Sequence, residues 1–545
     1  MMKRLFISKF QKFISLVLLL LINNNNFILL FSSALPCAKV TTSHGISCLC
    51  NTKYCDTVPP LPSNLGSNQY VIYTSSKKGL RLDQSIGTFK NFEEQTFMTS
   101  TSSPRKIHIN DKVLYQTIHG FGNAITDAAL VNYYKMEPQI QELLLKQYWG
   151  ADNEGTNFYI GRIPISSTDF STHVYSYDDV NDDYDLKHFS IQVDHDIGKI
   201  DFIKKVQSLN PNISFFATSW APPAWMTKQN TTIKNPSLRK DNNIPEIYSN
   251  YIVKFFEEYK KIGITFWGLT AQNEPAGNTG TWQDLKFSPE EERDFIKQCL
   301  GPALKKSNVT NNIKLMMLDD QRIHLPTWTK TILSDSDAAK YIDGIAVHWY
   351  AATEDITPSG LYFGFMNKTH TDYPSFFLLA TEACEGFLPW SKGVELGSWT
   401  RGETYAHDII GDINNWATGW TDWNAFLDLK GGPNWANNEC DSPIILDTEN
   451  TTQFYKQPMY YALAHFSSYV PKGSVRIDVQ SESTSILKAP MECTGFKTPD
   501  GHIVLVVLNK GLVSSDAEYS ITYGNKTISN LVAPANSLQT LIWNA

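Results

Sequence analysis

Two glutamates in this sequence stand where acid and base chemistry could be done. Each ends a short apolar run, in Asn273-Glu274-Pro275 and Thr381-Glu382-Ala383. Cleavage of a glycosidic bond with retention requires a carboxylic acid that protonates the leaving oxygen and, about 5 to 5.5 Å away, a carboxylate that attacks the anomeric carbon. An ionised nucleophile would also raise the pKa of the acid, as that role demands. Because the chain has 55 acidic residues, some glutamates will end apolar runs without any catalytic role. The assignment of this pair therefore needs support from the neighbouring residues.

The residue before Glu274 supplies that support and separates the two roles. Asn273 is placed to hydrogen-bond the 2-hydroxyl of a sugar, an interaction that strengthens in the transition state. Glu274 is therefore the candidate acid/base and Glu382 the candidate nucleophile. A sugar-binding protein without turnover is the alternative, and the presence of both glutamates beside Asn273 argues against it.

A repeated pattern predicts the fold that positions these residues. From about Gly120 onward, short apolar runs end in polar or aromatic residues and lead into helical stretches. The carboxyl ends of parallel strands face the mouth of a β/α barrel, where its active site lies. The pattern predicts an α/β fold, a (β/α)8 TIM barrel, with the two glutamates on the fourth and seventh strands. A doubly wound sheet would more often show a Gly-rich turn after its first strand. The eight runs end in Gly122-Asn123, Arg162-Ile163-Pro164, Ser219-Trp220, Asn273-Glu274-Pro275, Leu318-Asp319-Asp320, His348-Trp349-Tyr350, Thr381-Glu382-Ala383 and Asp422-Trp423-Asn424.

Two of the segments between these runs carry apolar residues at helical spacing. They predict helices over Tyr248 to Lys261 and over Glu290 to Leu304. Ser288-Pro289-Glu290 indicates the start of the second helix, with serine as the N-cap and proline in the first turn.

The flanking segments differ from the barrel, because they consist of short alternating β runs separated by turn signals. Residues 65–114 and 474–545 predict an accessory immunoglobulin-like β-sandwich. Residues 35–62 and 426–455 predict a small antiparallel β unit with disulfides. The TIM-barrel catalytic domain is then assigned to 115–425 and 456–473.

The N-terminus predicts a signal peptide over residues 1–34. Basic residues precede an apolar stretch from Phe13 to Ile22, which Asn23 to Asn26 interrupt before it reaches the roughly 20 residues that a membrane span needs. A membrane anchor is the weaker alternative. The prediction is a soluble protein of the secretory or endolysosomal lumen. Sequons at Asn212, Asn230, Asn308, Asn367, Asn450 and Asn525 are compatible with this compartment.

The eight cysteines agree with an oxidising compartment. Cys37, Cys48, Cys50 and Cys55 cluster after the predicted cleavage site and indicate two disulfides, whose pairing the spacing leaves open. The other four are dispersed, and we expect them to be free and mostly buried thiols.

The charge balance excludes one class of partner. A net charge of -8 argues against a nucleic-acid binder, which would show a basic stripe. The sequence shows no constellation of metal ligands, so neither a metal nor another cofactor is expected.

Several stretches resemble one known family in order along the mature chain. The sequence is similar to the lysosomal glucosylceramidases, the acid β-glucosidases of glycoside hydrolase family 30. The resemblance implies cleavage of β-glucosylceramide to glucose and ceramide at acid pH in the lysosome lumen. It also implies peripheral association with membranes, a saposin-type activator and anionic lipid. The stretches include Gly120-Phe121-Gly122, Thr126-Asp127-Ala128-Ala129, Met317 to Arg322, Gly344 to Tyr350, Glu382-Ala383-Cys384, Gly431 to Trp435 and Phe454 to Met459.

The resemblance also assigns roles to individual residues. Glu274 matches the acid/base of the family and Glu382 its nucleophile, with Arg162 in a supporting position. We expect His348 to be a supporting, structural histidine and not a general base, since both proton-transfer roles are already filled. It implies the disulfides Cys37–Cys48 and Cys50–Cys55. The chemistry of the side chains agrees with the role of Arg162, because its guanidinium can hold Glu382 ionised through a charge-assisted hydrogen bond. The residues expected to bind the sugar are Asp169, Trp220, Asn273, Tyr350, Trp423 and Asn438.

The chain departs from the family's pattern in the loop after the acid. Ala276 to Phe287 is shorter and differently composed, with Trp282 as its main bulky aromatic residue. Since this loop helps to form the mouth that receives the aglycone, a related activity such as a β-xylosidase or galactanase stays open. Glu385, three residues after the nucleophile, is expected to be a solvated or supporting charge.

Overall fold

The computed structural model describes residues 34–91, 105–150, 155–350, 361–483, 490–510 and 515–545. Contacts divide the chain into Met1–Ala34 and Leu35–Ala545, and the features below belong to the second unit. Nearly all of the predicted signal peptide lies outside the described residues. Within the described ranges, no helix combines the length and the apolar character that crossing a membrane requires.

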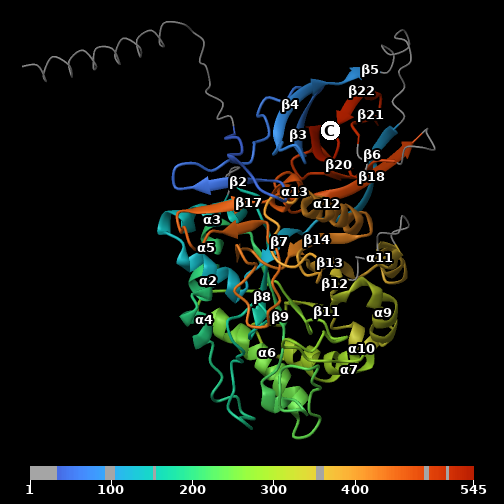
Figure 1. Cartoon of the computed structure of the whole chain (residues 1–545). Helices are drawn as coiled ribbons and strands as arrows, with labels where there is room; N and C mark the ends of the chain where they lie inside the picture. The colour runs from blue at the N-terminus through green and yellow to red at the C-terminus, as the bar shows by residue number, and fades with distance from the viewer. Residues whose placement is uncertain (1–33, 92–104, 151–154, 351–360, 484–489, 511–514) are drawn as a thin grey trace, which may run out of the picture. The chain divides into compact units, whose positions relative to one another are not determined.

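Eight parallel strands close into a barrel, which confirms the predicted TIM-barrel fold (Figure 1). Each of the eight predicted runs supplies one strand, and the glutamates follow or end the fourth and the seventh. β10 is short, so Glu274 lies four residues beyond the end of its strand. In chain order the strands are β7 (Gly120–Ala124), β8 (Ile160–Ile165), β9 (Ser214–Ser219), β10 (Gly268–Thr270), β11 (Lys314–Gln321), β12 (Gly344–His348), β13 (Phe377–Glu382) and β14 (Ala417–Asp422).

Helices follow the barrel strands. The helix predicted over 248–261 is part of the longer α6, and Ser288 caps α7 as predicted, with Glu291 completing a capping box. The helix predicted over 290–304 is instead divided into α7, the wider π-type turn η3 and α8. Pro302 explains the turn, because it has no N–H to bond to the carbonyl four residues earlier. The helices are α2 (Asp127–Lys135), α3 (Pro138–Trp149), α4 (Gln192–Asp196), α5 (Lys199–Leu209), η2 (Ala224–Met226), α6 (Ile244–Lys261), α7 (Pro289–Phe295), η3 (Ile296–Leu300), α8 (Gly301–Lys306), η4 (Arg322–His324), α9 (Leu325–Leu333), α10 (Ser336–Ala339), α11 (Leu361–Asp372), α12 (Trp399–Asn414) and α13 (Pro458–Ser467).

The two flanks of the barrel form a β-sandwich around a core of their own. Tyr519 donates to Gln539 Oε1 at 2.9 Å although their strands are not neighbours in the sheet, so two layers face each other. Among the described strands the hydrogen bonding is continuous, unlike the two separate sheets of an immunoglobulin-like sandwich. Long β6 makes the turn, since it pairs with β21 on one edge and, through bulges, with β18 on the other. The strands are β3 (Gln69–Ser76), β4 (Asp83–Thr88), β5 (Lys90–Asn91), β6 (Arg105–Thr117), β18 (Val475–Ser483), β19 (Glu492–Lys497), β20 (His502–Asn509), β21 (Ala517–Tyr523), β22 (Lys526–Ala533) and β23 (Ser537–Asn544).

A small sheet joins the N-terminal residues to the chain after the barrel. In Figure 1 the blue β2 lies beside the orange β17, and the two pair antiparallel. β15 and β16 run parallel, which differs from the antiparallel pairing that we predicted throughout. Both disulfides, Cys37–Cys48 and Cys50–Cys55, are formed as the resemblance implied. The four dispersed cysteines are free, and three of them are buried. The strands are β1 (Lys39–Thr41), β2 (Ile46–Asn51), β15 (Leu427–Asp428), β16 (Ile444–Leu446) and β17 (Gln453–Lys456).

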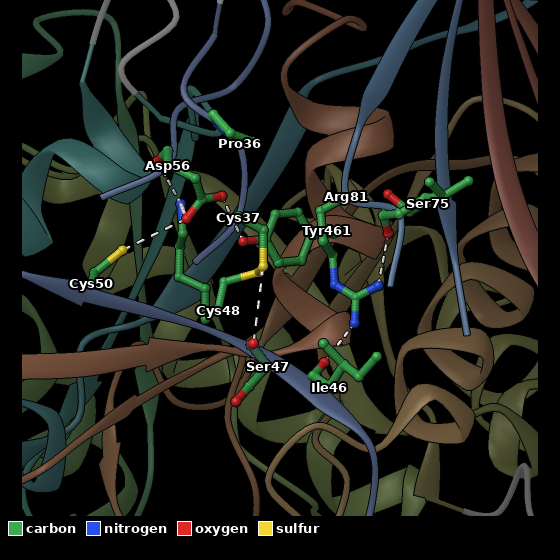
Figure 2. Close-up of a disulfide and its surroundings, with 12 residues drawn as sticks. Pro36, Cys37, Ile46, Ser47, Cys48, Cys50, Asp56, Ser75, Arg81 and Tyr461 are labelled. Carbon is green, nitrogen blue, oxygen red and sulfur yellow. Dashed lines mark hydrogen bonds and ion pairs between the residues drawn. A yellow bond between two sulfur atoms is a disulfide. The ribbon is translucent and has the colours of Figure 1, made fainter. Parts of the chain in front are cut away.

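A buried ion pair joins the N-terminal segment after β2 to β17 of this small sheet, and a hydrogen bond joins the same segment to α13. The carboxylate of Asp56 bonds Lys456 Nζ at 2.9 Å and accepts from the Tyr461 hydroxyl at 2.6 Å. Figure 2 shows Asp56 and Tyr461 beside the disulfide of Cys37 and Cys48. Burial lowers the pKa of Lys456, and Asp56 acts against this by favouring the ammonium form.

We expect Asp56→Ala to lower the free energy of unfolding by about 3 to 5 kcal/mol, because it leaves the Lys456 ammonium buried without a counter-charge. Denaturant unfolding of the purified protein would measure the change. The control is Asp185→Ala, which breaks an ion pair to Lys187 that is mostly exposed and should leave the midpoint nearly unchanged. Equal midpoints for the two variants would contradict the prediction.

Candidate active site

The two predicted glutamates meet at the carboxyl end of the barrel. An oxygen of Glu274 lies within 4.8 Å of an oxygen of Glu382. Glu382 ends β13, and its side chain is 5% exposed. Glu274 has a left-handed backbone, with φ of 43°, and its N–H donates to the Asp319 carbonyl at 3.0 Å. This separation suits a retaining pair of carboxylates, since inverting pairs lie about 6.5 to 9.5 Å apart.

Two donors hold the carboxylate of Glu382. Arg162 forms an almost fully buried ion pair with Oε2, and the Tyr350 hydroxyl donates to Oε1 at 2.8 Å. Burial raises the pKa of Glu382, and the charges of Arg162 and His348 act against it by favouring the carboxylate. The carboxylate of Glu382 is therefore held at both oxygens and charge-compensated at Oε2.

Asp319 is the centre of the site, although we assigned it no role from the sequence. Its carboxylate accepts from Arg162 Nη2 at 2.9 Å and from His348 Nε2 at 3.0 Å. Burial opposes the charged form, but Arg162 and His348 hold the pKa of Asp319 well below its usual range. An aspartate at the end of a predicted barrel strand was the signal that could have identified it. Three threonine hydroxyls also donate to it, from Thr218, Thr270 and Thr381.

His348 lies between the two glutamates. Nδ1 is 3.3 Å from Glu274 Oε1, and Nε2 is 3.9 Å from Glu382 Oε2. Burial alone would lower the pKa of His348, but the charges of Glu382 and Asp319 raise it to about 10. The imidazole is therefore a cation at neutral and acid pH. This fits the supporting role that we predicted better than the role of a base.

Glu274 has two further neighbours that sequence reasoning missed. Gln321 Nε2 donates to Glu274 Oε1 at 3.1 Å. Burial, and then the charge of Glu274, raises the pKa of Asp320 to about 8. Asp320 and Gln321 lie next to Asp319 at the carboxyl end of β11. The polar end of that strand was the signal in the sequence that could have identified them.

The predicted sugar-binding residues line the same mouth. The rings of Trp220 and Trp423 stack on each other with centroids 4.9 Å apart, and the Arg162 guanidinium lies 5.5 and 5.2 Å from their centres. Asn438 Nδ2 donates to Asp169 Oδ2 at 2.8 Å. Trp220 and Trp423 thus form an apolar wall of the mouth, and the Asn438 amide and the Asp169 carboxyl group form a polar edge.

Some polar atoms at this mouth have no protein partner. Asp169 Oδ1 and Trp220 Nε1 are buried and unpaired, which is costly unless a ligand or water completes them. Burial raises the pKa of Asp169 to about 8. Asn273 Oδ1 accepts from Arg162 Nη2 at 2.8 Å. The structure therefore brings together all of the predicted site residues and leaves polar atoms of Asp169 and Trp220 without a protein partner there.

The spacing of Glu274, His348 and Glu382 would also suit a metal ion. The charges do not, because Glu382 is already paired with Arg162 and His348 is itself a cation. A second set of possible metal ligands consists of Cys50, Cys55 and Asp56. Its two sulfur atoms form a disulfide, so they are not thiolate ligands. The arrangement fits acid and base chemistry by carboxylates.

A closed β/α barrel with two glutamates this close at its mouth defines a retaining glycoside hydrolase. Residues 118–470 match the glycosyl hydrolase family 30 TIM-barrel domain, and residues 473–541 match the beta sandwich domain of the same family. The chain therefore belongs to glycosyl hydrolase family 30.

Individual relatives agree with this assignment. The chain is 40% identical over 522 residues to the lysosomal acid glucosylceramidase of Mus musculus, covering 94% of this chain and 96% of the mouse enzyme. It is 27% identical over 406 residues to an endo-1,6-beta-D-glucanase of Neurospora crassa, covering 72% and 79%. The crystal structure of SrfJ from Salmonella typhimurium superposes with a TM-score of 0.78 at 28% identity, covering 88% of this chain and 100% of that one.

We expect His348→Gln to move the acid limb of the pH profile of kcat/KM upward by about one pH unit. Loss of the imidazolium charge raises the pKa of Glu382, so the carboxylate forms only at higher pH. The profile can be measured with an aryl β-glycoside that the wild type cleaves. His173→Gln, at an exposed histidine, is the control and should keep the wild-type profile. An unmoved acid limb in His348→Gln would show that this charge does not act on the nucleophile.

Proposed function

We propose that this enzyme hydrolyses β-glucosylceramide to glucose and ceramide by double displacement at acid pH. The observation that carries the proposal is the pair Glu274 and Glu382, with oxygens within 4.8 Å of each other at the barrel mouth. The similarity to the mouse lysosomal acid glucosylceramidase along nearly the full length of both chains supports the choice of substrate.

In the first step, the carboxylate of Glu382 attacks the anomeric carbon of the glucose ring. Glu274 donates its proton to the glycosidic oxygen, the bond from that oxygen to the sugar breaks, and ceramide leaves with a free hydroxyl group. Arg162 and Tyr350, which bond the two oxygens of Glu382, orient the carboxylate for attack.

In the second step, the charge of Glu382 has been consumed in the ester bond, so Glu274 can serve as a base. It takes a proton from a water molecule, whose oxygen attacks the anomeric carbon from the opposite face. The ester bond breaks, Glu382 recovers its charge, and glucose is released with its original β configuration. His348 stays protonated throughout, since its pKa is about 10.

The remaining predicted residues hold the glucose ring. Asp169 and Asn438 face the hydroxyl groups, with Asp169 Oδ1 free to bond. Trp220 and Trp423 provide the apolar wall, and Asn273, fixed by Arg162, bonds the 2-hydroxyl group. Binding energy at the 2-hydroxyl is gained most in the transition state.

The same proposal places the enzyme at a membrane surface in the lysosome lumen. The predicted signal peptide at 1–34 would deliver it, and the asparagines of all six sequons are exposed for glycans. Large apolar side chains are exposed in the loop after β13, in η4 and directly after β15: Trp390 at 79%, Ile323 and Leu429. These side chains suit contact with lipid. The partners that we propose for the enzyme are anionic lipid and a saposin-type activator.

Hydrolysis of glucosylceramide in vesicles at acid pH tests the proposal. We expect release of glucose, with a higher rate when the vesicles contain anionic lipid or a saposin-type protein is added. Glu382→Gln is the control and should release none. Preference for a β-xyloside, a β-galactoside or a β-1,6-glucan over β-glucosides would refute the substrate assignment.

The role of Glu382 has its own test. A 2-deoxy-2-fluoro β-glucoside with a good leaving group should label Glu382 covalently, because the fluorine slows the second step more than the departure of the leaving group. Mass spectrometry of the peptides locates the adduct. An adduct on Glu385 or another acid would overturn the assignment.

A further inference from the structure

Strand β11 carries an irregularity at the point where it reaches the site. Leu318 and Asp319 both have left-handed backbones, with φ of 72° and 55°. In the register with β12, Leu318 pairs with Ala346 and Asp320 with Val347, so Asp319 is the extra residue of a β-bulge. Neither residue is a glycine, and such a conformation persists only where the surroundings enforce it.

The bulge decides which way Asp319 points. Met316 belongs to the inner apolar layer of the barrel, with Phe216 and Leu379. Regular alternation along the strand would turn residue 318 inward as well and residue 319 outward. Instead, Leu318 is part of the large apolar core, and the Asp319 carboxylate bonds Arg162. Without the bulge, the centre of the site would face the helices.

A buried carboxyl group outside the site holds the bulge in place. Glu292, in α7, is 0% exposed, and its Oε1 accepts from the Leu318 N–H at 2.9 Å. Its Oε2 accepts from Trp328 Nε1 at 2.5 Å, which fixes the carboxyl group against α9. The Leu318 N–H therefore has a partner on a helix, in place of one in the barrel.

We propose that Glu292 is a positioning residue for the reaction, which acts by holding the bulge that orients Asp319 and Glu274. The link to Glu274 runs through the main chain, because the Asp319 carbonyl accepts from the Glu274 N–H. The inference rests on the proposed roles of Glu274 and Glu382 and extends them to a residue that contacts neither.

The test compares Glu292→Ala and Glu292→Gln with the wild type, using 4-nitrophenyl β-glucoside. Active sites are counted by the burst with a 2-deoxy-2-fluoro glucoside, so that kcat is expressed per working site. We expect kcat per site to fall ~10- to 100-fold in Glu292→Ala with KM nearly unchanged, because small misplacements of reacting groups have effects of this size. The kcat per site of Glu292→Gln should fall less than that of Glu292→Ala, because the glutamine carbonyl oxygen can still accept from one of the two N–H donors.

The matched control is Glu290→Gln on the same helix, whose exposed carboxylate accepts from Ser288 Oγ. It should keep the wild-type kcat. A purely structural role for Glu292 would lower the number of titrated sites but leave kcat per site within about twofold of wild type in both variants, and this result would overturn the proposal. Glu292→Gln keeps the test valid if the alanine variant does not fold.

A second measurement addresses the link to Glu274. If the bulge positions the acid, the loss in Glu292→Gln should be larger for an alkyl β-glucoside than for a dinitrophenyl β-glucoside, since good leaving groups need less protonation. Equal losses would overturn that link. If the wild type cleaves another β-glycoside in place of glucosides, the proposed substrate fails, and the same comparison is made on the sugar that it does cleave.

Discussion

The site depends on one buried cation, the guanidinium of Arg162. It bonds Asp319 and Glu382 at once, and both carboxylates are almost fully buried. Carboxylates in such surroundings keep their charge only if a partner compensates it. His348 adds a second positive charge on the other side of Asp319. Two cations thus permit two ionised acids at the base of the mouth. The third carboxyl group, that of Glu274, lies 3.3 Å from His348.

The barrel is what allows these charges to meet. Arg162, Asp319, His348 and Glu382 come from β8, β11, β12 and β13, so no pair of neighbouring helices or strands could supply the set. Parallel strands bring their carboxyl ends to one mouth, and the buried threonines of three strands complete the bonds to Asp319. The sandwich and the small sheet contribute no charge to this group. Their contacts to neighbouring elements, such as that of Asp56 with Tyr461 of α13, serve the fold.

The sequence predicted what depends on local pattern and missed what depends on contacts. The strand ends, the two glutamates and the N-cap at Ser288 are visible because strand periodicity, polar strand ends and capping each leave a local signal. The bulge at Asp319 leaves none, since no glycine marks its left-handed residues and its partner Glu292 lies 26 positions away. The continuous sandwich sheet and the parallel pair of β15 and β16 were missed for the same reason: strand pairing is set by contacts between distant segments.

The buried acids around the site suit an acid medium. Burial raises the pKa of Asp169 and Asp320 to about 8 and that of Asp284, Glu292 and Glu385 to about 7. Glu385 is half-buried, so it is not a fully solvated charge, and the supporting role that we gave as the other expectation stays a prediction. For a carboxyl group with a raised pKa, the stability gained by the neutral form is complete below the unfolded value near 4 and is lost as pH rises toward the folded value. Ionisation of Asp169 as the pH rises toward its folded pKa of about 8 would also add negative charge beside Glu382 and oppose the compensation of that carboxylate by Arg162. The surroundings of the two glutamates therefore favour the neutral forms of these five acids on the acid side of neutrality.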